Sequence, residues 1–245
     1  MAFLIPDNVR YDNGVKICEK IIPDSAVWNR DVKEGGYTYR KGTTYKANRP
    51  LSSIKGVTIH NTGRIKIPNG TTMAEQYTRA TYPNCNMGSV RVHYYVDENE
   101  AWQNLDESEV GWHAADGNYG PGNSTTIAIE IIMDGTDAEY NRIAEDNGAR
   151  LCAAILKRHG LDETAVYQHH DWYARKDCPV YIRPHWSAFL AAVRQYLGAG
   201  PQSQTDYDRL VKEIADLKDR LQQQRTNVQD FRDEILAAIA KYDEK

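Results

Sequence analysis

The sequence predicts an α/β domain with a mixed central β-sheet flanked by helices, followed by a C-terminal α-helical coiled-coil segment. Apolar strand patterns alternate with helical ones over about residues 48–197, which is typical of α/β domains. Beyond residue 206, apolar side chains recur in heptads. We therefore expect a main domain over 1–198, a linker over 199–206 and a coiled-coil helix over 207–245.

The elements of the main domain follow from local patterns. The first buried strand is Gly56–His60, which we expect to end at a polar turn over Asn61–Gly63. A helix follows over Thr72–Tyr82, with Thr71 or Thr72 as its cap. Two strands then follow, a β-rich alternating segment at Val90–Asp97 and a partner at Ala101–Leu105.

The second half of the domain repeats the alternation. The expected elements are an apolar strand, a long helix that stops at Gly160, a short strand and a final helix, at Thr126–Met133, Ala138–His159, Val166–His169 and Pro184–Leu197. Residues 1–50 show no regular pattern. Their role in the domain stays open.

Composition excludes two classes of protein. The 245 residues hold 30 Lys+Arg and 34 Asp+Glu, with a net charge of −4. This balance lacks the basic face of a nucleic-acid-binding protein, so we expect no nucleic acid partner. No apolar run approaches the ~18 residues of a membrane helix, so we expect no membrane insertion.

The N-terminus and the cysteines indicate a reducing compartment. Residues 1–10 have no basic segment before an apolar stretch and no small-residue cleavage site, so we expect no signal peptide. The four cysteines lie far apart in the sequence, at Cys18, Cys85, Cys152 and Cys178. Reduced thiols are expected, one of which could bind a metal.

The segment after residue 198 predicts self-association. Residues 198–205 form a polar linker rich in Gly, Pro and Ser. The heptad core positions beyond it are Tyr207, Leu210, Ile214, Leu217, Leu221, Gln224, Val228, Phe231, Ile235, Ala238 and Tyr242. We expect a homo-oligomer through residues 207–242, in which the helices could pair in parallel or antiparallel orientation. The alternative is a single amphipathic helix that packs on the main domain.

Three residues suggest a metal site. His60 and His169 lie at expected strand ends, and Cys178 lies in a turn nine residues after His169. Two imidazoles and a thiolate are the ligands of a catalytic zinc site whose fourth position stays open for water. The spacing alone leaves an alternative, because an isolated cysteine is more often a small buried apolar residue.

Six ordered sequence blocks resemble one enzyme family. They are Asn48–Pro50, Gly56–Gly63 (GVTIHNTG), Val92–Asp97 (VHYYVD), Gly111–Gly117 (GWHAADG), Gly122–Glu130 (GNSTTIAIE) and His169–Pro179 (HHDWYARKDCP). In this order they resemble the zinc-dependent N-acetylmuramoyl-L-alanine amidases of the phage endolysin type, which share their fold with peptidoglycan recognition proteins. The resemblance implies cleavage of the amide bond between N-acetylmuramic acid and L-alanine of the stem peptide of peptidoglycan.

The resemblance also implies site residues. The family's zinc ligands correspond to His60, His169 and Cys178, with one Zn²⁺ per chain. Its catalytic strand glutamate corresponds to Glu130, and the lysine two residues before the last ligand corresponds to Lys176. Zinc lowers the pKa of a bound water to about 7. Glu130 is suited to transfer the proton, and Lys176 or a histidine to stabilise the oxyanion.

Four further residues are predicted to contact substrate: Asn61, His93, Trp112 and His113. Trp112 and His113 lie in a Gly-rich loop, where Trp112 offers an aromatic face. His93 has an alternative interpretation as a buried sheet histidine. The chain departs from some members at Val92, where these carry a tyrosine; Tyr94 follows instead.

Adjacent histidines compete for the second ligand position. Neighbouring residues on a strand point to opposite faces, so only His169 or His170 faces the metal. The family's His-x-Asp pattern favours His169. Asp171 would then hold a ligand in place or act structurally.

Other functions are also considered. The first alternative is a non-catalytic or weakly catalytic peptidoglycan-binding module on an oligomeric coil. The second is a coil-driven structural protein. The thiolate ligand is absent from non-catalytic relatives, so Cys178 favours the enzyme. The His-Glu-x-x-His string of zinc peptidases is absent. We expect a phage or prophage product that is made in the host cytoplasm and acts on the cell wall after release.

Overall fold

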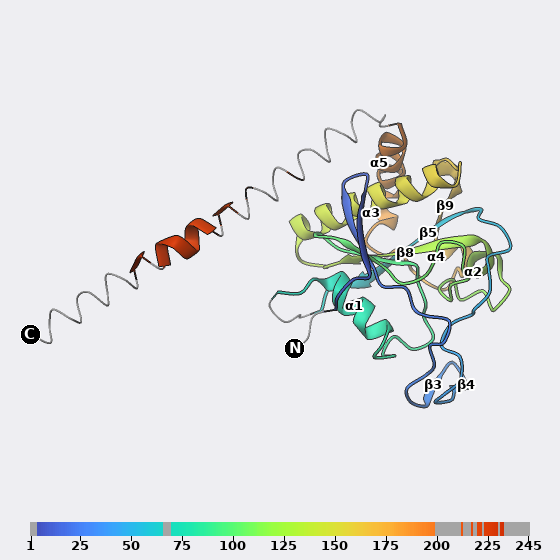
Figure 1. Ribbon diagram of the computed structural model, residues 1–245. Helices are drawn as coiled ribbons and strands as arrows, with labels where there is room; N and C mark the ends of the chain where they lie inside the picture. The colour runs from blue at the N-terminus through green and yellow to red at the C-terminus, as the bar shows by residue number, and fades with distance from the viewer. Residues whose placement is uncertain are drawn as a thin grey trace, which may run out of the picture. The chain divides into compact units, whose positions relative to one another are not determined.

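The computed structural model describes residues 4–65, 70–198 and, nearer the C-terminus, 212, 217, 220, 221, 223–229, 231 and 232. The chain divides into two compact units, Met1–Ala199 and Gly200–Lys245. The first unit contains a mixed β-sheet with helices on both faces (Figure 1).

The main sheet has seven strands in the order β1-β2-β7-β6-β8-β5-β9. They are β1 (Asn8–Asp12), β2 (Val15–Glu19), β7 (Ala101–Gln103), β6 (Tyr94–Val96), β8 (Thr126–Met133), β5 (Gly56–Gly63) and β9 (Val166–Gln168). The strands β6, β8, β5 and β9 run parallel to one another, whereas the β1–β2 and β6–β7 pairs are antiparallel. The sheet is therefore mixed, as the sequence predicts. A separate hairpin pairs β3 (Val32–Glu34) with β4 (Tyr37–Tyr39).

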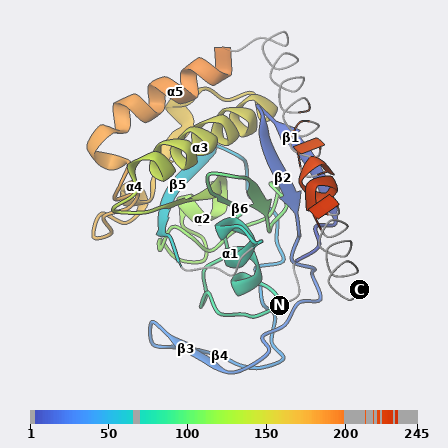
Figure 2. The ribbon, with the colours of Figure 1, turned by 90° about the vertical axis from the view of Figure 1, so that its left-hand side faces the viewer.

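Helices cover both faces of the sheet. The long helix α3 (Ala138–Arg158) and α5 (Trp186–Gly198) lie on one face, and α1 (Met73–Thr81) lies on the other (Figure 2). The short helices are α2 (Pro121–Thr125), η1 (Glu163–Ala165), α4 (His169–Trp172) and η2 (Arg183–His185). These helices identify the two faces of the sheet, so each strand residue can be assigned to the α3 side or to the α1 side.

Strand β8 shows how the alternation of side chains separates the two faces. A Cβ atom added at Gly148 of α3 would lie 2.3 Å from Cδ1 of Ile131, so the helix packs directly on this side chain. The neighbouring Glu130 therefore faces the α1 side. Its register partner on β5 is His60 and its partner on β6 is Tyr95, whose ring stacks on Tyr77 of α1.

Most predicted elements occur with shifted ends. Strand β5 continues to Gly63 instead of turning after His60, because it pairs with β8 along its full length. The segment Val90–Asp97 forms a strand only over Tyr94–Val96. The predicted strand Val166–His169 stops at Gln168, and His169 begins α4. The cap of α1 is Thr72, whose hydroxyl accepts the Glu75 amide at 3.1 Å.

The N-terminal region is more regular than the sequence analysis expects. Strands β1 and β2 form a hairpin whose turn residues, Asn13 and Gly14, have φ of 46° and 82°. An Asn-Gly pair between strand residues is a strong hairpin signal, so the expectation of no regular pattern in residues 1–50 is wrong here. Strand β2 then joins the sheet by pairing in parallel with β7.

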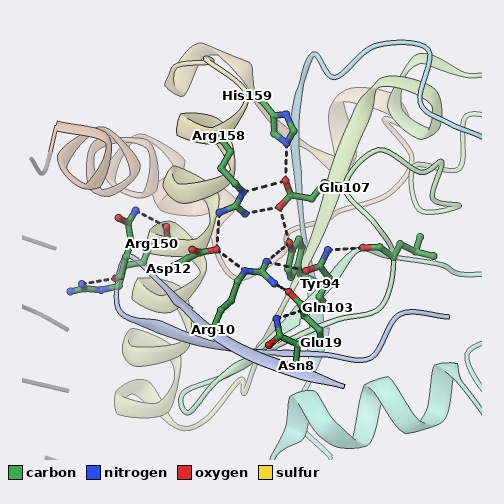
Figure 3. A network of polar contacts seen from close by, with 12 residues as sticks. Asn8, Arg10, Asp12, Glu19, Tyr94, Gln103, Glu107, Arg150, Arg158 and His159 are labelled. Carbon is green, nitrogen blue, oxygen red and sulfur yellow. Dashed lines mark hydrogen bonds and ion pairs between the residues drawn. The ribbon is translucent and has the colours of Figure 1, made fainter. Parts of the chain in front are cut away.

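A polar network fixes this hairpin to the rest of the domain (Figure 3). Glu107 accepts hydrogen bonds from the Tyr94 hydroxyl at 2.7 Å and from Arg158 at 2.6 Å, and it contacts His159 Nε2 at 2.7 Å. Arg158 also pairs with Asp12 of β1 at 2.7 Å. Burial alone would raise the pKa of Glu107, but the hydrogen bond and charge of Arg158 outweigh it and lower the pKa to about 2.

Replacing Glu107 is expected to destabilise the domain in a pH-dependent way. Because the folded-state pKa lies below the ordinary value of 4.5, the stabilisation is present above that pH and disappears as the pH falls toward 2. Glu107→Gln should lower the unfolding free energy by about 2–3 kcal/mol at pH 7 and much less at pH 3. Denaturant unfolding at both pH values measures this. Glu139→Gln, at an exposed ion pair with Arg142, is the matched control and should change little. An equal loss at both pH values would contradict the prediction.

The described residues of the second unit are helical. Five predicted heptad positions are among them: Gln224 is exposed, and the apolar Leu217, Leu221, Val228 and Phe231 are 51–69% exposed. The predicted core positions Tyr207, Leu210, Ile214, Ile235, Ala238 and Tyr242 lie outside the described residues. Among the described helices, none combines the length and hydropathy that crossing a membrane requires.

Candidate metal centre and active site

The site begins at His60 on β5, the strand next to the edge strand β9. His60 lies on β5 between β8 and β9, and only 1% of its surface is exposed. Strand β9 runs parallel to β5, so its carboxyl end delivers the next residue, His169, to the same edge. The chain then loops back and brings Cys178 beside them.

The structure brings these three side chains together. Their ligand atoms lie within 4.8 Å of one another, and all three residues are buried. His60 Nδ1 lies 3.0 Å from His169 Nδ1 and 4.0 Å from Cys178 Sγ. In the described part of the chain, no other cluster of His, Cys, Asp and Glu has a metal-binding arrangement.

The chemistry of the cluster fits a divalent cation such as zinc. Burial lowers the pKa of His60 well below its ordinary value and that of His169 to about 4, so both rings are neutral and have a free lone pair. Burial and the nearby Glu130 charge raise the pKa of the Cys178 thiol to about 12. A coordinated cation reverses this, because a coordinating thiol is deprotonated. Three donors of this kind leave a position for water.

His170 lies outside the cluster. Its Nδ1 is 3.0 Å from the Lys176 carbonyl oxygen, and its amide donates to the Cys178 carbonyl at 3.0 Å. His170 thus braces the loop that carries Cys178. Asp171 accepts the Gln168 amide at 2.8 Å and so caps α4, which is the structural role considered for it.

Asn61, a predicted substrate contact, makes hydrogen bonds to three other segments of the protein. The backbone amide of Asn61 lies 3.4 Å from Cys178 Sγ. Its side-chain Nδ2 donates to the Ile131 carbonyl, and its Oδ1 accepts the Tyr181 backbone amide at 3.0 Å. Asn61 follows His60 on the strand, so its side chain points to the opposite face. Asn61 therefore holds the loop that carries Cys178 from the opposite face of the sheet, and its side-chain amide is occupied by these hydrogen bonds.

Glu130 is the carboxylate beside the cluster. It is the register neighbour of His60, and its Oε2 is buried without a hydrogen-bond partner. Burial raises the pKa of Glu130 to about 8, against the opposing charge of Lys176. Lys176 itself is exposed on the loop before Cys178. A carboxyl group with a pKa near neutrality is suited to exchange protons during catalysis.

The other predicted substrate contacts separate into two groups. His93 is fully buried, with Nε2 at 2.8 Å from the Glu109 carbonyl and Nδ1 accepting the Ala128 amide at 3.0 Å. Both nitrogens are occupied, so the structure favours the alternative of a buried structural histidine. Trp112 is partly exposed on the loop after Gly111.

His113, by contrast, is buried against the cluster. Its Nδ1 lies 3.1 Å from His60 Nε2, and its backbone is held by Asn123, whose Oδ1 accepts the amides of His113 and Ala114. Sequence reasoning missed this contact and the role of Asn123, because 53 residues separate His60 from His113. The Gly-Trp-His block around His113 is the signal that pointed to this loop.

A mixed sheet with a buried His₂Cys cluster beside two neighbouring strands, β5 and β9, and a proton-exchanging carboxylate next to it is typical of a metal-dependent hydrolase. The profile of the N-acetylmuramoyl-L-alanine amidase family matches residues 50–181, more than half of the chain. The chain therefore belongs to this family.

Individual curated relatives of this chain are amidases of the same family. The amidase CwlH of Bacillus subtilis strain 168 is 31% identical over 137 residues, covering 56% of this chain and 52% of CwlH. XlyA of the same strain is 31% identical over 147 residues, covering 60% of this chain and 46% of XlyA. This chain spans about half the length of these curated relatives.

Solved structures give the same fold. The catalytic domain of XlyA superposes with a TM-score of 0.57 at 26% identity, covering 73% of this chain and 99% of that domain. PlyL superposes with a TM-score of 0.58 at 25% identity, covering 74% of this chain and 98% of PlyL. The match to a catalytic domain along nearly its whole length indicates which part of the longer relatives this chain resembles.

Proposed function

We propose that this chain hydrolyses the amide bond between N-acetylmuramic acid and L-alanine of the peptidoglycan stem peptide, with one zinc ion held by His60, His169 and Cys178. The observation that carries the proposal is the buried His₂Cys cluster with Glu130 as its neighbour on the adjacent strand. The names of the relatives, which are amidases of this specificity, supply the substrate class.

Each group at the site has a separate role in the proposed hydrolysis. When bound, zinc would polarise the scissile carbonyl and activate water for attack. Glu130 accepts the proton of the attacking water and returns it to the departing amide nitrogen, which must be protonated to leave. Lys176 brings a positive charge near the developing oxyanion. Trp112, which precedes His113 on the same loop, offers an aromatic face.

The bond that is cut can be identified directly. Incubation of the full chain with purified peptidoglycan is expected to release new alanine amino groups without new reducing sugar ends. Dialysis against a strong chelator should abolish the release, and added zinc should restore it. Reducing sugars without free alanine amino groups would identify a glycosidase and contradict the proposal.

The same function suggests where the protein acts. One solved relative at 27% identity, with a TM-score of 0.56, is described as an endolysin from Bacillus subtilis. We propose that this chain likewise acts on the bacterial cell wall as a phage or prophage product. A peptidoglycan-binding module without catalysis is the weaker candidate, because Cys178 and Glu130 are both present beside the two histidines.

We further propose that residues 207–242 form a homo-oligomeric coiled coil. Leu217, Leu221, Val228 and Phe231 follow heptad spacing, and their exposure in the single chain leaves them free for a partner helix. Burial of each side chain would contribute about 1.5–3 kcal/mol. Several catalytic domains on one coil would bind a polymeric wall with greater avidity.

Truncation after Gly198 is expected to change both size and lysis. Light scattering at micromolar concentration should give an oligomer for the full chain and a monomer for residues 1–198, and the truncated protein should lyse whole cells more slowly. Activity on a small soluble muropeptide, which offers no avidity, should be equal for the two forms. A monomeric full chain would contradict the coiled coil.

A further inference from the structure

The two ring nitrogens of His60 face different partners. Nδ1 points to His169 Nδ1 and Cys178 Sγ, whereas Nε2 lies 3.1 Å from Nδ1 of His113. The His60 and His113 rings meet edge to face, with an interplanar angle of 89°. Nδ1 of the His60 ring therefore faces the other two residues of the His₂Cys cluster, and Nε2 faces His113.

This division determines where the His60 proton must lie. A nitrogen that binds a metal needs a free lone pair, so a neutral His60 that uses Nδ1 carries its proton on Nε2. A buried N–H requires an acceptor. Nδ1 of His113 lies at the right distance, and it accepts this proton when the proton of His113 lies on its own Nε2. That Nε2 is buried without a hydrogen bond of normal geometry, and the Thr126 backbone is the group that interacts with the His113 ring. The unpaired N–H therefore falls on His113, while both nitrogens of His60 are satisfied.

The loop around His113 is built to hold the ring in this position. Asn123 Oδ1 accepts the amides of His113 and Ala114 at 2.7 and 2.8 Å, and Asn123 Nδ2 donates to the Gly117 carbonyl at 3.0 Å. At Gly111, an added Cβ would lie 2.7 Å from the Arg91 carbonyl oxygen and 3.1 Å from Cδ2 of His113. Only glycine therefore allows the loop to approach this closely.

We propose that His113 is a positioning residue that orients His60 and fixes its tautomer, so that Nδ1 faces the metal. This role replaces the direct substrate contact expected from the sequence, because His113 is only 6% exposed. The inference rests on the proposed function in taking the cluster as a zinc site. His113 acts through His60 and touches neither the metal nor the scissile bond.

The experiment compares three variants whose side chains place polar atoms differently. His113→Asn puts an amide oxygen near the position of Nδ1, His113→Gln puts its amide near Nε2, and His113→Leu offers no acceptor. Zinc affinity is measured by chelator competition in the full chain at pH 7.5. We expect affinity to fall 10- to 100-fold in His113→Leu and His113→Gln, and to stay within a few-fold of the wild type in His113→Asn. His185→Asn, at an exposed ion pair with Glu145, controls for loss of a histidine.

A second measurement reads the tautomer without a metal. Two-bond ¹H–¹⁵N spectra of the imidazoles in the metal-free chain should show His60 protonated on Nε2 in the wild type and in His113→Asn, and a mixture in His113→Leu. Protonation of wild-type His60 on Nδ1, or equal zinc affinity in His113→Leu and the wild type, would overturn the inference. A wild-type protein that binds no zinc would contradict the proposed function, while the tautomer measurement would still test the role of His113.

Discussion

The Cys178→Ser protein is expected to lose nearly all of its zinc. Cys178 is the only thiol among the described residues that lies beside His60 and His169, and a serine hydroxyl is a much weaker ligand than a thiolate. The loss of affinity should exceed the roughly 10- to 100-fold typical of changes outside the ligand set. Elemental analysis after purification, together with chelator competition, measures it, and amidase activity should fall in parallel.

A matched control separates this effect from the loss of a buried thiol. Cys18 is also buried and unpaired, but it lies on β2, where its thiol contacts Glu100. Cys18→Ser should keep one zinc per chain. If Cys178→Ser retains full zinc and full activity, the proposed ligand set is wrong.

The Glu130→Gln and Glu130→Ala proteins should keep zinc and lose most of their turnover. Glu130 is adjacent to the cluster without belonging to it, so its removal eliminates proton transfer while the donors remain. Loss of a general acid–base residue lowers the rate by about 10²- to 10⁴-fold. The measurements are kcat on a soluble muropeptide and zinc content on the same preparations.

The pH profile gives an independent test of the same residue. A general base works in its deprotonated form, so wild-type kcat/KM should rise with pH through the pKa of Glu130. Burial holds that pKa at about 8 in the metal-free protein, and a bound cation would move it lower. The acid limb should disappear in the residual activity of Glu130→Gln. Full activity in either variant would mean that another group is the base.

Several elements of the fold could be predicted because their signals are local. Strand β8 and helix α3 occupy almost the expected residues, since a continuous apolar run and a long helical period depend only on nearby positions. The hairpin of β1 and β2 also had a local signal in Asn13-Gly14, but its segment lacks strong apolar alternation. Strand ends were less predictable, because β5 extends to Gly63 only through its pairing with β8.

The charged network could not be predicted in the same way. Asp12, Glu107 and Arg158 meet although more than 50 residues separate the closest two of them in sequence. Each alone resembles an ordinary surface charge. Their contacts follow from the position of β1 relative to the end of α3, which no local pattern encodes.

Local sequence was enough to predict the alternation of strands and helices, the blocks that resemble the amidase family, and the heptads after residue 206. These are properties of neighbouring side chains and of residue order. The position of β5 between β8 and β9 depends on strand pairing over long sequence distances, and this pairing brings His60 to His113, His169 and Cys178. Long-range pairing also engages Asn61 and His93 in hydrogen bonds within the protein, because it decides which face each side chain occupies and which backbone groups it must satisfy.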